Sequence, residues 1–148
     1  MRVEVDQSIK IEQTSRDTVL AAANDIKRCV LLRASTKRQL IQLLREENIL
    51  PEIFYPKIFC AALFILLKPL LNKTQEFIID EEYTGKERQM KVLLNEYARK
   101  SKVPPIARRV TFHRVGKKSP AHELANEARK KRSNVYKIDL EEMLALIL

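Results

Sequence analysis

The sequence predicts one α/β domain built on a five-stranded mixed sheet. Three strands form an antiparallel meander, two further strands run parallel, and helices cover both faces. Three apolar segments rich in β-branched residues follow one another in the first 33 residues, with turn residues between them. Helical and strand-like segments alternate after them, and a strand–helix–strand step implies a parallel pair with a right-handed crossover. A chain of 148 residues can bury a sizeable core, so we expect a single domain over 1–148.

The expected strands are short segments bounded by turn residues. They cover residues 2–5, 18–23, 26–33, 77–80 and 108–115. The first strand resumes through Ile9 and Ile11, and the turn at Asn24 and Asp25 tolerates positive φ, which suits a hairpin. The fifth strand alternates, so that Val110 and Phe112 share one face.

Five helices are expected, and a recognisable signal begins each one. They cover about 35–48, 57–71, 85–101, 120–132 and 139–148. The expected caps or first residues are Ser35 with Thr36, Pro56, Thr84 with Glu87, Ser119 with Pro120, and Asp139 with Glu142. The second helix is apolar nearly all round, which predicts that it lies buried against the sheet.

The chain is strongly basic, which favours a polyanionic partner. Lys and Arg number 28 against 19 Asp and Glu, a net charge of +9. The basic residues that we expect to contact nucleic acid are Arg108, Arg109, Arg114, Lys117, Lys118, Arg129 and Lys130. The alternative is a solvated basic face. Aromatic residues do not interleave with these cations, so a duplex, a hybrid or branched nucleic acid is the expected partner rather than a single strand.

Three observations predict a soluble cytoplasmic protein without a membrane partner. Cys29 and Cys60 both lie in apolar runs, which is typical of small buried side chains rather than of disulfides or metal ligands. The chain begins with a strand pattern rather than a signal peptide, and the apolar run 58–67 is too short to span a bilayer.

Acidic residues follow two of the predicted strands. Asp6 follows the first strand, and Asp80, Glu81 and Glu82 end the fourth. If these strands are parallel neighbours, Asp6 and Asp80 lie side by side at about 5 Å strand spacing. Two carboxylates so close repel each other, and a cation relieves the repulsion. The alternatives are that Asp6 bonds a turn backbone, that Asp80 favours the start of the next helix, and that Glu81 and Glu82 are solvated, although one of them could be a second ligand.

Three short motifs resemble the ribonuclease H-like superfamily, which includes ribonucleases H, Holliday-junction resolvases, transposases and integrases. Asp6-Gln7-Ser8 resembles its first-strand Asp-x-Ser motif, and Asp80-Glu81-Glu82-Tyr83 resembles the Asp-x-x-Tyr that ends its fourth strand. The segment from Gly116 to Ala125 resembles the entry to its last helix, where the family places a final Asp, Glu or His.

The resemblance implies phosphodiester hydrolysis with two divalent metal ions, Mg²⁺ or Mn²⁺. The metal ligands that it predicts are Asp6, Asp80, Glu82 and Glu123, and the catalytic residues are Asp6, Asp80, His122 and Glu123. His122 in the first turn of its helix is either a ligand, a proton donor or a polar boundary residue. Two features differ from ribonuclease H: the buried helix offers Phe59 and Ala62 where an acid is expected, and Asn126 stands where several relatives have Asp.

These observations lead to one expected function and two alternatives. The expected function is a metal-dependent nuclease that acts on RNA, an RNA–DNA hybrid or branched DNA. The first alternative is a non-catalytic ribonuclease H-like module that binds nucleic acid or a protein. The second is an interaction protein that forms a homodimer through its apolar C-terminal helix, in which Leu140, Met143, Leu144 and Ile147 make an apolar stripe.

Overall fold

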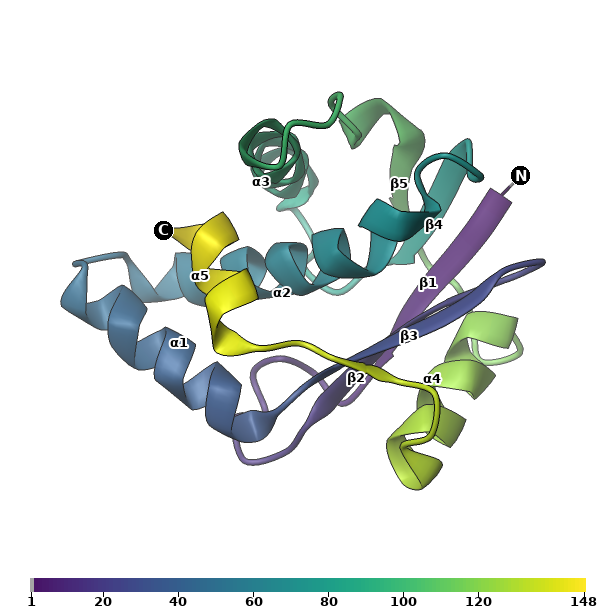
Figure 1. Ribbon diagram of the computed structural model, residues 1–148, viewed down its shortest axis with the longest axis horizontal. Helices are drawn as coiled ribbons and strands as arrows, with labels where there is room; N and C mark the ends of the chain where they lie inside the picture. The colour runs from purple at the N-terminus through teal and green to yellow at the C-terminus, as the bar shows by residue number, and fades with distance from the viewer. Residues whose placement is uncertain (1) are drawn as a thin grey trace.

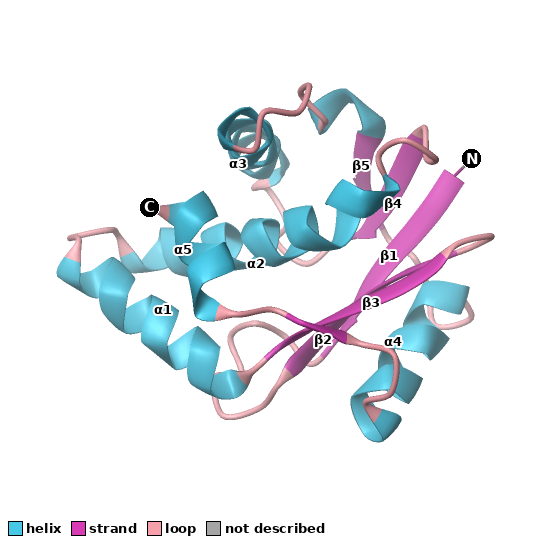
Figure 2. Ribbon diagram, viewed as in Figure 1, coloured by secondary structure: helices cyan, strands magenta, loops and turns pink. Residues whose placement is uncertain are grey.

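The computed structural model describes residues 2–148 and shows a six-stranded mixed sheet with five helices (Figures 1 and 2). The strands are β1 Arg2–Ser8, β2 Thr18–Ala23, β3 Lys27–Leu32, β4 Glu76–Asp80, β5 Val110–His113 and β6 Tyr136–Lys137. The helices are α1 Ala34–Glu46, α2 Pro51–Leu67, α3 Glu87–Lys100, α4 Pro120–Lys131 and α5 Leu140–Ile147. Two single-turn 3-10 helices, η1 Lys68–Leu70 and η2 Ala107–Arg109, precede β4 and β5.

The strands lie in the order β5-β4-β1-β2-β3-β6. The pairs β1–β2 and β2–β3 are antiparallel, and β1–β4 and β4–β5 are parallel. The predicted meander and the parallel pairing of the first and fourth strands are therefore confirmed. The predicted strand count is wrong, because Tyr136 and Lys137 add a sixth strand parallel to β3. The sequence predicts that residues 135–138 are extended, but both residues of this strand are exposed, so no apolar pattern predicts that they pair with the sheet.

Helices cover both faces of the sheet, but unequally. The main core lies between one face of the sheet and α1, α2, α3 and α5, and α4 alone packs on the other face (Figure 1). The smaller core beneath α4 joins Val19, Ala21, Cys29 and Leu31 to Ala125 and Ala128. The alanines of α4 let this helix approach the sheet closely, which brings its polar side chains next to β1.

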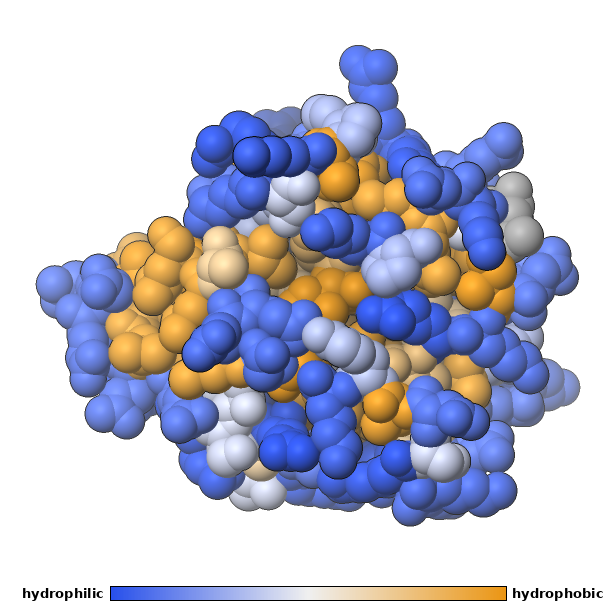
Figure 3. Space-filling model, viewed as in Figure 1, coloured by the Kyte–Doolittle hydropathy of each residue, from blue (hydrophilic) through white to orange (hydrophobic). Residues whose placement is uncertain are grey.

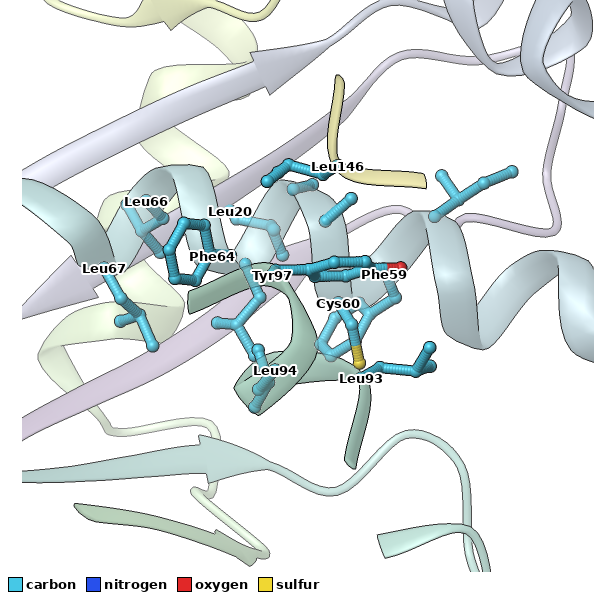
Figure 4. Close-up of a cluster of buried hydrophobic side chains, with 14 of the residues drawn as sticks. Leu20, Phe59, Cys60, Phe64, Leu66, Leu67, Leu93, Leu94, Tyr97 and Leu146 are labelled. Carbon is cyan, nitrogen blue, oxygen red and sulfur yellow. The ribbon is translucent and has the colours of Figure 1, made fainter. Parts of the chain in front are cut away.

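The central helix α2 is buried nearly all round, as its composition predicts. Figure 4 shows Phe59, Cys60 and Phe64 of α2 packed against Leu94 and Tyr97 of α3. Aromatic and aliphatic side chains of this size supply most of the free energy of burial in a domain core.

The predicted start of α2 is wrong. The helix begins at Pro51, whose fixed φ suits the first helical position, and Pro56 lies inside the helix. With η1 the helical segment covers Pro51–Leu70, 20 residues that are long and apolar enough to cross a membrane. The apolar run 58–67 is therefore part of a longer helical segment than the sequence pattern predicts. In this fold, 67% of its apolar window is buried inside the protein.

Two of the predicted local caps are also wrong. The first helix begins at Ala34, and its N–H donates to Oδ1 of Asp17 at 2.7 Å instead of to a cap at Ser35 or Thr36. The helix α3 begins at Glu87 after Lys86, without a side-chain cap from that residue. The carboxylate of Asp17 comes from the β1–β2 loop, so this cap depends on tertiary contact rather than on neighbouring sequence.

The caps of the last two helices are confirmed. Ser119 Oγ accepts a hydrogen bond from the N–H of Ala121 at 3.1 Å, with Pro120 at the first helical position. Asp139 and Glu142 form the predicted capping box at the start of α5. Both signals lie within four residues of sequence, which is why sequence alone identifies them.

The loop between β1 and β2 is held by a buried lysine. Lys37 of α1 is fully buried, and its Nζ donates to three backbone carbonyl oxygens of this loop. These belong to Lys10 at 3.3 Å, Gln13 at 3.2 Å and Arg16 at 2.8 Å. Burial lowers the pKa of Lys37 to about 8, against the opposing charge of Asp17. The loop is therefore anchored next to the end of β1, where the acidic residues lie.

The apolar stripe of α5 packs mostly on the chain's own core. Met143, Leu146 and Ile147 are buried. The face shown in Figure 3 still carries apolar area, and large exposed apolar side chains include Leu50 and Leu148. A homodimer through α5 stays a prediction, and it would have to use the outer side of that helix.

Candidate metal centre

The site forms where β1 and β4 end side by side. Their parallel register pairs Val5 with Ile79, so the next residues, Asp6 and Asp80, are neighbours. Val5 and Ile79 belong to the main core. Because successive side chains of a strand point to opposite faces, Asp6 and Asp80 project toward the face covered by α4. The predicted proximity of these two acids is confirmed.

Three carboxylates converge at this edge. One oxygen each of Asp6, Asp80 and Glu82 lies within 4.8 Å of the others. They line a pocket of about 360 Å³. Its remaining lining residues are Gln7, Arg114, Gly116, Lys117 and His122.

The carboxylates disturb one another's protonation. Burial, followed by the hydrogen bond and charge of Asp80, raises the pKa of Glu82 to about 7, and the nearby Gln7 amide opposes this rise. Burial also raises the pKa of Asp6, although hydrogen bonds from His122 and Gln7 act in the opposite direction. Crowded acids that resist ionisation are the arrangement that a divalent cation stabilises.

His122 holds Asp6 in place. Its Nδ1 lies 2.8 Å from Oδ2 of Asp6, and the amide nitrogen of Asn126 lies 3.2 Å from its Nε2. A carboxylate only accepts hydrogen bonds, so Nδ1 carries the proton and Nε2 accepts from Asn126. Both ring nitrogens are thus engaged. This geometry makes His122 an orienting group for Asp6 rather than a metal ligand.

Backbone donors fix the other oxygens of the two aspartates. The N–H of Gln7 donates to Oδ1 of Asp6 at 2.8 Å. The N–H of Val115 donates to Oδ1 of Asp80 at 2.9 Å, which ties the end of β4 to the segment after β5. The orientation of each aspartate is therefore set by rigid neighbours, as a metal centre requires.

Gln7 is a site residue that sequence reasoning missed. Gln7 is only 9% exposed. Its amide lies near enough to Glu82 to lower the pKa of that carboxyl, but neither its oxygen nor its nitrogen has hydrogen-bond geometry with a partner among residues 2–148. An unpaired buried amide is costly. An amide oxygen is also a good ligand for hard divalent cations. Gln7 follows Asp6 in the predicted motif, but nothing in the sequence distinguishes it from an ordinary polar strand end.

The structure brings four of the predicted site residues together and leaves one apart. Asp6, Asp80, Glu82 and His122 line the pocket. Glu123 is exposed on α4 and does not line it. One step along a helix turns a side chain by about 100°, so Glu123 points away from the side of α4 that His122 occupies.

The predicted basic residues lie in four environments. Arg114 and Lys117 line the acidic pocket, and Arg108, Lys118 and Lys130 are exposed. The guanidinium of Arg109 donates to the carbonyl oxygens of Leu71 and Thr74, and it lies over the ring of Phe77. Arg109 therefore already has structural partners. Arg129 faces a different pocket, beside the β1–β2 loop.

Comparisons with protein-family models, with curated proteins and with solved structures found no match to this chain. The ribonuclease H-like resemblance drawn from Asp6, Asp80 and the last helix stays a prediction.

Proposed function

We propose that this protein is a metal-dependent nuclease that hydrolyses phosphodiester bonds in RNA, an RNA–DNA hybrid or branched DNA. One observation carries the proposal: carboxylate oxygens of Asp6, Asp80 and Glu82, from two adjacent strand ends, lie within 4.8 Å of one another. A ribonuclease H-like fold is part of the same proposal, supported by the strand order and by helices on both faces.

The residues present fit Mg²⁺ or Mn²⁺. Asp6, Asp80 and Glu82 supply carboxylate oxygens, and the unpaired amide of Gln7 supplies a neutral oxygen. Such all-oxygen donor sets suit these hard cations. A bound ion would polarise the phosphoryl group and lower the pKa of a bound water. The resemblance predicts two ions, and calorimetric stoichiometry separates one from two.

The remaining groups of the site position the acids and attract phosphate. His122 and Asn126 orient Asp6, and the N–H of Val115 orients Asp80. Arg114 and Lys117 are exposed at the rim of the pocket. Cations around an acidic centre hold the substrate backbone beside the ions without reading its sequence.

The test is cleavage of end-labelled RNA, hybrid duplex and four-way DNA junction with Mg²⁺ or Mn²⁺. Asp6→Asn and Asp80→Asn should each lower the cleavage rate at least about 100-fold, because each removes a charged ligand. The matched control is Asp25→Asn, an exposed acid in the β2–β3 turn that should leave the rate unchanged. Equal rates in wild type and Asp80→Asn would remove the acidic cluster from the reaction.

A second candidate function is a non-catalytic module that binds nucleic acid or a protein. Two observations favour it: α2 offers only buried Phe59 and Ala62 where ribonuclease H has an acid, and α4 presents Asn126 to His122 rather than a carboxylate to the site. Salt-sensitive binding of a duplex without cleavage under either metal would support this alternative.

A further inference from the structure

A second polar pocket lies at the far end of α4, away from the acids. Its volume is about 250 Å³. The β1–β2 loop supplies Ile9, Ser15, Arg16 and Asp17, and α4 with its C-cap supplies Arg129 and Arg132. We call it the arginine pocket.

The arginine pocket has an excess of positive charge. Its one carboxylate, Asp17, already accepts from Arg132 Nη1 at 2.5 Å and from the N–H of Ala34 at 2.7 Å. Arg16 and Arg129 have no carboxylate partner within 4.0 Å among residues 2–148. The Nε of Arg129 is buried without a hydrogen-bond partner in that same range. Guanidinium groups without a carboxylate partner are suited to binding a phosphate, which accepts paired hydrogen bonds from them.

We propose that the arginine pocket binds a backbone phosphate of a nucleic-acid strand, and that the same strand reaches the pocket of Asp6, Asp80 and Glu82. This inference rests on the proposed function. The chemical class of the ligand is a phosphodiester within a strand, and the pocket reads no base.

Two independent elements give the spacing between the pockets. On α4, His122 borders the acidic pocket and Arg129 borders the arginine pocket, seven residues or about 10 Å farther along. On β1, Asp6 and Ile9 border the same two pockets, three residues or about 10 Å apart. Phosphates of one strand advance about 3.4 Å along a duplex axis per nucleotide and also wind around that axis, so the pockets lie at most about three nucleotides apart.

The two pockets open on the same side of α4. His122, Asn126 and Arg129 lie at positions i, i+4 and i+7, which form one stripe of a helix. The loop that completes the arginine pocket is anchored, since Lys37 donates to the carbonyl oxygen of Arg16 at 2.8 Å. A strand that lies along this stripe can therefore reach both pockets without rearrangement of the fold.

The experiment measures binding of a fluorescein-labelled 12-bp hybrid by anisotropy, in EDTA so that no cleavage occurs, between about 50 and 300 mM salt. Arg129→Gln and Arg16→Gln should each weaken binding about ten-fold at low salt. Each should also reduce the slope of log K against log salt concentration by about one. The matched control is Arg99→Gln. Arg99 is exposed near the C-terminal end of α3 and lines neither pocket, so this variant should bind like wild type. Because Arg16 is exposed, Arg16→Gln should not disturb folding. It therefore tests the pocket even if Arg129→Gln fails to fold.

A second measurement tests the spacing. Substrates that end one, two, three or four nucleotides beyond the cleaved bond are compared, with each strand end shortened separately. Arginine substitution should weaken binding only when about two or three nucleotides remain on one side.

Wild-type binding and salt dependence in both Arg16→Gln and Arg129→Gln would overturn the inference, even in a protein that cleaves. Arginine-dependent binding by a protein that never cleaves would instead overturn the nuclease function and keep the pocket as a phosphate site. A wild-type protein that binds none of the nucleic acids would overturn both.

Discussion

Asp6 is held by the chain Asn126–His122–Asp6, which links α4 to β1 by hydrogen bonds of 3.2 and 2.8 Å. Partners of this kind fix the direction in which a ligand presents its oxygens. We expect His122→Ala to lower the affinity for Mn²⁺ about 10- to 100-fold and Asn126→Ala to lower it less. His122→Asn keeps a donor near Asp6 and should restore part of the affinity.

Isothermal titration calorimetry at pH 7.5 checks this expectation. His113→Ala, an exposed histidine of β5, is the control that should bind Mn²⁺ like wild type. Unchanged affinity in His122→Ala would mean that His122 does not orient a ligand.

Glu82 should cost stability in the metal-free protein. Burial, followed by the effect of Asp80, raises its pKa from 4.5 to about 7. A raised pKa favours the protonated carboxyl in the folded state. Glu82 therefore does not destabilise the fold below pH 4.5, and it destabilises the fold increasingly as the pH rises through about 7. Glu82→Gln should therefore be more stable than wild type by about 2 kcal/mol at pH 8, after allowance for solvent screening, and no more stable at pH 4.

Urea unfolding in EDTA at both pH values measures this difference. Glu81→Gln is the control, because the neighbouring Glu81 is exposed. With saturating Mg²⁺ at pH 8, wild type should instead have a higher free energy of unfolding than Glu82→Gln. A pH-independent difference would show that Glu82 is not the group that titrates.

At the scale of elements, Asp17 joins three parts of the chain. Its Oδ1 accepts from the first N–H of α1, and its Oδ2 accepts from Arg132 at the end of α4. Removing a carboxylate that caps a helix typically costs about 1 kcal/mol. We expect Asp17→Ala to lose about 1–2 kcal/mol of unfolding free energy, and Asp17→Asn to lose less because its amide oxygen still caps α1. Asp25→Ala is the control in thermal unfolding, and an equal loss in Asp17→Asn and Asp17→Ala would contradict the cap.

The element that sequence predicted least well is β6. It contributes two exposed residues to the sheet edge, and the cation of Arg28 lies 5.4 Å from the ring centroid of Tyr136. Such a strand forms because β3 offers a free edge and α5 anchors the chain beyond it. Neither condition is visible in the residues of β6.

For the whole molecule, α5 acts as part of the core. Leu146 is 7% exposed and lies in the main core, and the carbonyl oxygen of Leu146 accepts from Lys100 of α3 at 2.8 Å. Leu146→Ala should cost about 2–4 kcal/mol of unfolding free energy, because it leaves a cavity in that core. Sedimentation should give the same mass for wild type and variant, whereas loss of a dimer in the variant would support association through α5. Leu50→Ala, at an exposed position outside α5, is the control.

Much of the fold and part of the site follow from the sequence alone. Short apolar segments separated by turn residues determined the meander, the uniformly apolar composition of α2 determined its burial, and the caps at Ser119 and Asp139 determined where two helices begin. The placing of Asp6 and Asp80 at strand ends made their proximity predictable. These signals act over a few residues, where backbone geometry and side-chain period are nearly independent of the rest of the chain.

The partners of those residues depend on how the folded chain packs. Asp6 and His122 are 116 positions apart in sequence, and Asp17 caps a helix 17 positions away. The pocket of Arg129 likewise exists because α4 packs closely on β1 and β2. Contacts of this kind depend on how whole elements pack, and packing depends on the summed burial of many apolar side chains rather than on any local pattern.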